Sequence, residues 1–290
     1  MIEWGDSLIK ELAARRCIVF FGAGASVGCR ATVGDLTRTP PNWEQLLTAL
    51  TRRLGAGTAD RTLAEQLIHE KKFLEAAEII VSAINAADYS DALRQLLELP
   101  RYNQSSVHES ILRLDPKIAI TTNYDTIYDR YCTSGNAAEG YNVVHYTHDH
   151  LVQQLRSPAR VIIKAHGCIT NTNKIVLTKS DYFTARRDFP NFFKILDALS
   201  LTHTILFLGY SLNDPDIQIA LENANISAPS TNRHYFVAQA GTHPALKSAA
   251  SRAYNTTFLE FPTGQYNVLN DSLSELADRV LEYRALNPDG

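Results

Sequence analysis

Four short polar segments of this chain combine residue types that can do chemistry with backbone that can bind a ligand. Each follows, or includes the end of, an apolar and β-branched run, as loops at strand ends do. The segments are Gly22-Ala23-Gly24-Ala25-Ser26, Thr121-Thr122-Asn123-Tyr124-Asp125, Lys164-Ala165-His166-Gly167 and Gly209-Tyr210-Ser211-Leu212-Asn213-Asp214. Together they offer glycine amides, an amide side chain, a carboxylate and an imidazole. Polar loops at the strand ends of an open α/β sheet are how such a sheet builds one ligand site.

The first segment, from Gly22 to Ser26, suits an anion such as a phosphate. Glycines let the backbone approach an anion closely, and exposed amide groups can hold it. A tight turn without a ligand explains the same glycines equally well. The spacing to Gly28 is Gly-x-Gly-x-x-x-Gly, and no clean strand ends in an acidic residue about 20 positions later, so an ordinary dinucleotide dehydrogenase is a poor match.

Asn123, Asp125 and His166 are the side chains that we expect to take part in chemistry. A helix cap is the alternative for Asn123 and Asp125, because both residue types satisfy free amide donors at helix starts. A lone histidine at a strand end is more often structural, but a neutral imidazole can accept a proton from a hydroxyl near neutral pH. Ser26 and Ser211 lie outside the Gly-x-Ser-x-Gly pattern of serine hydrolases.

The elements that must hold these loops alternate between strands and helices. Apolar runs predict strands at 17–21, 117–121, 142–146, 161–165, 204–209, 233–238 and 256–261. Helical spacing of apolar residues predicts helices at 3–16, 125–133, 148–156, 179–186, 190–201, 214–224, 243–252 and 267–286. This alternation indicates a Rossmann-like α/β fold, with a largely parallel sheet and helices on both faces.

Residues 42–113 interrupt the alternation after the first strand. Helical spacing recurs in segments 43–54, 61–70, 72–86, 88–98 and 104–114, and no convincing strand separates them. We interpret this region as a helical insertion within a single α/β domain that spans residues 1–290 and ends in the helix at 267–286. The insertion is placed to shape the substrate pocket or to carry a partner interface. The preceding residues, 26–41, are rich in Gly and Pro and predict a loop.

Composition and charge argue against several function classes. The net charge of −3 gives no electrostatic reason to expect nucleic acid. No apolar stretch approaches the roughly 18 residues of a membrane helix, and no signal peptide is visible. The four cysteines lie outside Cys-x-x-Cys pairs, which favours reduced thiols in the cytoplasm over a zinc module. His145, His148 and His150 match no common zinc spacing, so we expect no metal.

The order of the four segments resembles the sirtuin-like NAD-hydrolase family, especially its bacterial antiphage-defence branch of Thoeris-type and related abortive-infection effectors. Thr121 to Asp125 resembles the Thr-Gln-Asn-Ile-Asp motif, His166 with Gly167 resembles the catalytic His-Gly, and Gly209 to Asp216 resembles Gly-Tyr-Ser-Leu-x-Asp-x-Asp. Residues 41–47 resemble the Pro-x-Trp-x-x-Leu-Leu stretch that follows the glycine loop in such proteins. The resemblance covers roughly residues 14–32, 112–136 and 160–224, outside the helical insertion.

The resemblance implies a role for each site residue. Asn123 would place water or substrate at the anomeric carbon of the nicotinamide ribose, Asp125 would hold the carboxamide, and His166 would be the base or ribose anchor. Thr122 stands where the motif has Gln. The other residues implied to contact NAD+ are Gly22, Ala23, Gly24, Ala25, Ser26, Thr122, Gly209, Ser211 and Asn213.

The implied reaction is hydrolysis of NAD+, the substrate, to nicotinamide and ADP-ribose without a metal. Protein deacylases of the family carry two Cys-x-x-Cys pairs and a Gly-Ile-Pro-Asp-Phe-Arg continuation, both missing here. Uncontrolled NAD+ depletion would poison the cell, so we expect control by a partner protein in trans or by homo-oligomer assembly. Two alternatives stay open: a protein ADP-ribosyltransferase or deacylase, and a non-catalytic nucleotide-binding subunit of a larger defence complex.

Overall fold

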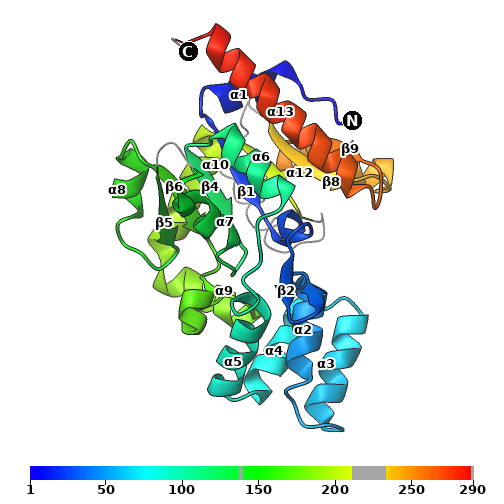
Figure 1. The fold of residues 1–290 in the computed structure, drawn as a ribbon. Coiled ribbons are helices and arrows are strands. Elements are labelled where there is room, and N and C mark those ends of the chain that lie inside the picture. Colours follow the sequence, from blue (N-terminus) through cyan, green and yellow to red (C-terminus); the bar gives the residue numbers. More distant parts are fainter. Residues whose placement is uncertain (137–139, 211–232, 289–290) are drawn as a thin grey trace.

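A computed structural model describes residues 1–136, 140–210 and 233–288, and a parallel sheet lies at its centre (Figure 1). Within these residues the sheet has seven strands in the order β5-β6-β4-β1-β7-β8-β9. The strands are β1 (Cys17–Phe21), β4 (Ile118–Thr121), β5 (Tyr141–His145), β6 (Arg160–Lys164), β7 (Thr204–Leu208), β8 (His234–Gln239) and β9 (Thr256–Phe261). All pairings between them are parallel, which confirms the predicted Rossmann-like α/β fold.

Helices cover both faces of this sheet (Figure 1). One face packs against α1 (Asp6–Ala13), α6 (Ser106–Leu114), α7 (Ile127–Tyr131) and α13 (Tyr266–Leu286). The other face packs against α8 (Leu151–Arg156), α9 (Lys179–Asp188), α10 (Pro190–Thr202) and α12 (Pro244–Tyr254). In β1, Val19 and Phe21 enter the first core while Ile18 and Phe20 enter the second. Burial on both faces is why the strands appear as continuous apolar runs in the sequence.

Four helices between β1 and β4 form a lobe with its own core at the bottom of Figure 1. They are α2 (Trp43–Thr51), α3 (Ala59–His69), α4 (Phe73–Ala83) and α5 (Ala86–Leu97). Ile169, Ile175 and Leu177, from the segment after β6, are buried in the same core. The lobe is therefore fastened to the end of the sheet where β6 stops. The fifth helix of the predicted insertion, α6, packs instead against α13 beside the sheet.

The structure differs from the predicted loop at residues 26–41. A short antiparallel hairpin occurs there, formed by β2 (Ala31–Val33) and β3 (Leu36–Arg38), with Gly34 at φ +61° in the turn. Nearly all of its side chains are exposed, so it lacks the apolar alternation that identifies a half-buried strand. Three short helical turns complete the described elements: η1 (Ala23–Ser26), η2 (Cys132–Asn136) and η3 (Ile169–Lys174).

The helix predicted at 214–224 lies outside the described residues. In the ranges that the structure does describe, no helix combines the length and apolar character needed to cross a bilayer.

Candidate functional site

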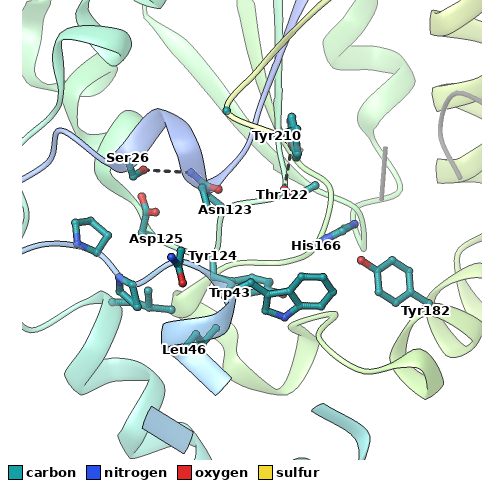
Figure 2. A pocket seen from close by; sticks show the side chains of 16 residues that line it. Ser26, Trp43, Leu46, Thr122, Asn123, Tyr124, Asp125, His166, Tyr182 and Tyr210 are labelled. Atoms are coloured by element: carbon teal, nitrogen blue, oxygen red, sulfur yellow. Dashed lines mark hydrogen bonds between the residues drawn. The ribbon is translucent and has the colours of Figure 1, made fainter. Parts of the chain in front are cut away.

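The carboxyl ends of β1, β4, β6 and β7 meet at one pocket (Figure 2). β4 and β6 lie on one side of β1 and β7 lies on the other, so the strand order reverses beside β1. Open α/β sheets bind their ligands at this kind of position. The pocket occupies about 730 Å³, including its open mouth.

Most of the residues predicted from the sequence come together here. Those that line the pocket are Ala23, Ser26, Thr122, Asn123, Asp125, His166 and Gly209. Gly22, Gly24 and Ala25 belong to the same loop as Ala23 but are not lining residues. Ser211 and Asn213 lie outside the described residues. The amide, the carboxylate and the imidazole thus face one cavity, although they follow different strands.

The glycine loop after β1 is packed tightly against the end of β7. A Cβ atom on Gly24 would lie 2.6 Å from the Cα of Gly209, and one on Gly22 would lie 2.4 Å from the ring of Tyr210. The amides of Gly22, Gly24 and Ala25 donate to the carbonyls of Leu208, Gly209 and Gly22, respectively. Close approach of two backbones therefore accounts for Gly24, and contact with the Tyr210 ring accounts for Gly22. The three amides are already used within the protein.

The loop after β4, from Thr122 to Asp125, is tied to several other elements. The Thr122 hydroxyl lies 3.0 Å from the hydroxyl of Tyr210, after β7. Asn123 Nδ2 lies 3.3 Å from both the Gly22 carbonyl and the Ser26 hydroxyl, in the loop after β1. The Tyr124 hydroxyl donates to the Val176 carbonyl at 2.8 Å. These contacts fix the loop against the segments that follow the neighbouring strands.

Asp125 both accepts a helix-start amide and lines the pocket, so the two placements predicted as alternatives occur together. Its Oδ1 accepts a hydrogen bond from the amide of Ile127 at 2.9 Å, as a helix-starting residue does. The side chain also lines the pocket, although the residue is 7% exposed. Capping therefore orients the carboxylate and leaves its remaining lone pairs available toward the cavity.

His166 reaches the pocket from the turn that follows β6. Gly167, at φ +82°, makes this turn, and a Cβ atom there would lie 2.2 Å from the Lys174 carbonyl oxygen. The ring of Tyr182 meets the imidazole edge-to-face, with centroids 5.2 Å apart. Burial lowers the pKa of His166 to about 3. The imidazole is therefore neutral at physiological pH and can accept a hydrogen bond.

Comparison with known proteins places this arrangement in a family. A family model described as "SIR2-like domain" matches residues 117–259, which include Asn123, Asp125 and His166. Residues 117–259 of this chain are thus SIR2-like.

Relatives of this SIR2-like chain are found in several bacteria. The NAD(+) hydrolase ThsA of Acinetobacter baumannii is 25% identical over 237 residues, which is 80% of this chain and 44% of that protein. Defense-associated sirtuin 2 of Bacillus subtilis is 25% identical over 217 residues, or 73% of this chain and 20% of that protein. The NAD(+) hydrolase ThsA of Bacillus cereus is 22% identical over 231 residues, or 78% of this chain and 44% of that protein. The chain spans less than half the length of these relatives.

The helical lobe supplies the second wall of the SIR2-like pocket, which sequence reasoning did not assign residue by residue. This wall consists of Pro40, Pro41, Asn42, Trp43, Leu46 and Leu97. A reciprocal capping box between Asn42 and Gln45 starts α2 and places Trp43 at the first turn. The Pro-x-Trp stretch was the available signal for Trp43, whereas nothing in the sequence pointed to Leu97 or Tyr182.

The lining of the SIR2-like pocket has a distinct charge and aromatic character. Among its described lining residues there is no Lys or Arg, and Asp125 is the single carboxylate. Trp43, Tyr124, Tyr182 and Tyr210 contribute aromatic rings. Within the described part of the chain, no group of three His, Cys, Asp or Glu side chains is placed to hold a metal ion. Aromatic faces with one carboxylate suit a flat organic cation.

Proposed function

We propose that this SIR2-like chain hydrolyses NAD+ at the nicotinamide–ribose bond, giving nicotinamide and ADP-ribose. The observation that carries the proposal is that Asn123, Asp125 and His166 line one pocket at the carboxyl end of the sheet. Relatives named NAD(+) hydrolase ThsA support the same activity. The described part of the lining is aromatic and contains no Lys or Arg, which suits the pyridinium ring of NAD+, the positively charged reacting end.

The reaction needs positioning and charge stabilisation more than acid catalysis. A water molecule adds to C1′ of the ribose, the bond from C1′ to the pyridinium nitrogen breaks, and nicotinamide leaves as a neutral base with the bonding electrons. The proton lost by the water passes to solvent. The site must stabilise positive charge that moves from the pyridinium to the ribose ring, and it must place the water.

The three central residues match these needs. Asp125 is proposed to hold the carboxamide and to favour positive charge beside it. Asn123 is proposed to place the attacking water at C1′. His166 is neutral because burial lowers its pKa to about 3, so it is proposed to accept a hydrogen bond from a ribose hydroxyl.

The rest of the dinucleotide is proposed to lie along the loops after β1 and β7. Of the predicted loop residues, Ala23 and Ser26 line the pocket and are the strongest candidates for contact, together with Thr122 and Gly209. Gly22, Gly24 and Ala25 do not line the pocket, and their amides hydrogen-bond within the two loops and to the end of β7. Ser211 and Asn213 remain proposed contacts from the family motif.

We also propose a biological setting. One relative is named an NAD(+) hydrolase and another a defense-associated sirtuin, both from bacteria. On this support we propose a regulated effector of bacterial antiphage defence, active in the cytoplasm, that depletes NAD+ when triggered. Control is proposed to come from homo-oligomer assembly or from a partner protein acting in trans. The sheet and the helical insertion are proposed to work as one domain, because the lobe supplies a wall of the pocket.

Chromatographic measurement of nicotinamide release tests the activity. Wild type is assayed alone and with proteins encoded beside it, next to Asn123→Ala and His166→Ala. Asn142→Ala and His148→Ala are matched controls, because these residues of the same types lie outside the pocket lining. Release by wild type and both controls, abolished in the two pocket variants while they remain folded, is the expected result. Bound NAD+ that is never cleaved under any condition would favour a binding subunit instead.

A further inference from the structure

Lys164, the last residue of β6, has a side chain that is buried beneath the pocket and only 1% exposed. Side chains alternate along a strand, so Lys164 lies on the same sheet face as Ile162, where α7 packs. Two residues further along the chain, His166 lines the pocket. A lysine this deeply buried is rare unless it is paired, which calls for an explanation.

The ammonium group of Lys164 joins β6 to the loop that follows β4. Its Nζ donates a hydrogen bond to the backbone carbonyl of Asp125 and lies 3.4 Å from Oδ2 of Asp129 in α7. Burial by itself lowers the pKa of Lys164, but Asp129, with Cys168 and Asp125, outweighs burial and raises it. The lysine therefore stays protonated and continues to donate.

Stability does not explain this arrangement. Burying an ammonium–carboxylate pair is costly, and apolar residues of similar volume often stabilise a fold equally well or better. Oδ1 of Asp129 is buried without a hydrogen-bond partner among the described residues, and burial raises the pKa of this carboxyl group. A half-satisfied pair is a poor source of stability, so the value of Lys164 lies in what it holds in place.

What Lys164 holds is the backbone at the centre of the site. Residues 122–126 belong to no helix or strand. Side chains of Thr122, Asn123 and Tyr124 contact neighbouring elements, and the Tyr124 carbonyl accepts a hydrogen bond from the Ile169 amide at 2.8 Å. Lys164 adds an anchor for the main chain one residue further along, at Asp125. The Asp125 carboxylate accepts a hydrogen bond from the Ile127 amide at the start of α7, so a shift of its main chain would also redirect that carboxylate.

We propose that Lys164 is a positioning residue that holds Asp125, and through the shared loop Asn123, in the geometry needed to cleave the nicotinamide–ribose bond. This inference rests on the proposed function. Its effect is expected mainly in kcat, because binding uses the whole pocket whereas bond cleavage depends on the alignment of a few groups at the reacting carbon.

The test compares Lys164→Met and Lys164→Arg with a matched control, Lys117→Met. Lys117 directly precedes β4 at the opposite end of the sheet, and its Nζ donates to the carbonyls of Ser157 and Ala159. Both methionine variants thus lose an ammonium group that donates to backbone carbonyls. Only the Lys164 variant loses it beside the pocket. The readouts are kcat and KM for NAD+, thermal unfolding, and amide hydrogen exchange in residues 122–127.

Lys164→Met is expected to lower kcat about 10- to 100-fold with a smaller change in KM, and Lys164→Arg is expected to recover part of the loss. Lys117→Met is expected to keep kcat. Equal kcat in Lys164→Met and Lys117→Met would overturn the inference. If wild type does not hydrolyse NAD+, the proposed function fails, and hydrogen exchange still decides the inference. Faster exchange at 122–127 in Lys164→Met alone supports the clamp, and unchanged exchange rejects it.

Discussion

The two ends of the central sheet use charge in different ways. At the amino end, Asp115 pairs with three guanidinium groups: Arg160, Arg15 at 2.5 Å and Arg284 at 3.8 Å. At the carboxyl end, Lys164 meets one carboxylate at 3.4 Å and one backbone carbonyl, and the described pocket lining above it holds no Lys or Arg. The amino end therefore has an ion network of four residues, whereas Lys164 at the carboxyl end forms one ion pair among the described residues.

We interpret the ion network at the amino end as a contribution to stability and the polar groups at the carboxyl end as available for ligand binding. Burial raises the pKa of Asp115, but its hydrogen bonds to Arg160 and Arg15 outweigh burial and hold the pKa below the usual value. The network thus favours the folded, ionised state and joins the starts of β1, β4 and β6. At the carboxyl end, the Asp125 carboxylate accepts the Ile127 amide on one oxygen, and a carboxylate can accept several hydrogen bonds, including from a ligand.

The same substitution at each end gives the largest contrast. Asp125→Asn keeps an oxygen for the Ile127 amide but removes the pocket's carboxylate charge. We expect turnover of NAD+ to fall by roughly 100-fold or more, because removing one preorganised polar group from a site of developing charge has effects of that size. Nicotinamide release measures the loss, and thermal unfolding should change little. Full turnover in this variant would remove Asp125 from the mechanism.

At the amino end, Asp115→Asn is expected to have the opposite profile. It leaves Arg15, Arg160 and Arg284 without their shared carboxylate. We expect a loss of about 2 kcal/mol in the free energy of unfolding, below the range for fully buried pairs because Asp115 is partly exposed. Denaturant unfolding measures it. Turnover per folded molecule should stay near wild type, and a large drop would show that the two ends are coupled.

A tryptophan substitution sharpens the description of the carboxyl end. Trp43→Ala removes part of the wall that the helical lobe contributes to the pocket. We expect KM for NAD+ to rise about tenfold with a smaller change in kcat, because a wall contact binds substrate and transition state alike. Trp4→Phe is the control, since the Trp4 indole donates to the Ser272 carbonyl outside the pocket. An unchanged KM in Trp43→Ala would mean that the lobe does not contact substrate.

The smallest expected effect is a difference in pH window between the two ends. The pKa of His166 is lowered to about 3 in the folded state, against about 6.5 when unfolded, so below pH 6.5 the unfolded state binds the extra proton. Stability is therefore lost as pH falls, by about 1 kcal/mol between pH 7.5 and 5.5. His166→Gln should show a shallower loss in denaturant titrations across this range. A slope equal to that of wild type would contradict the lowered pKa.

Asp115 acts in a lower window. Its pKa is lowered in the folded state, so its stabilisation is present above the pKa of the unfolded state and is lost only as pH falls below about 4. Asp115→Asn should therefore flatten the pH dependence of the free energy of unfolding below about pH 4, whereas His166→Gln should flatten it near pH 6.

The strands could be predicted closely from the sequence, and the exposed or long-range features could not. The predictions at 17–21 and 256–261 match β1 and β9 residue for residue, because β strands buried on both faces are apolar throughout. The β2–β3 hairpin was missed because its side chains are exposed and show no burial pattern. The separation of α6 from the other insertion helices was also missed, since helical spacing does not say what a helix packs against.

The sequence by itself determined the fold class and predicted that Asn123, Asp125 and His166 share one site, because strand-end motifs are local and depend on residue type and spacing. Only the tertiary structure decided why Gly24 must be glycine, that Trp43 faces the same pocket, and that Lys164 clamps the carbonyl of Asp125. Each of these depends on a contact between segments far apart in the chain, which spacing along the sequence does not encode.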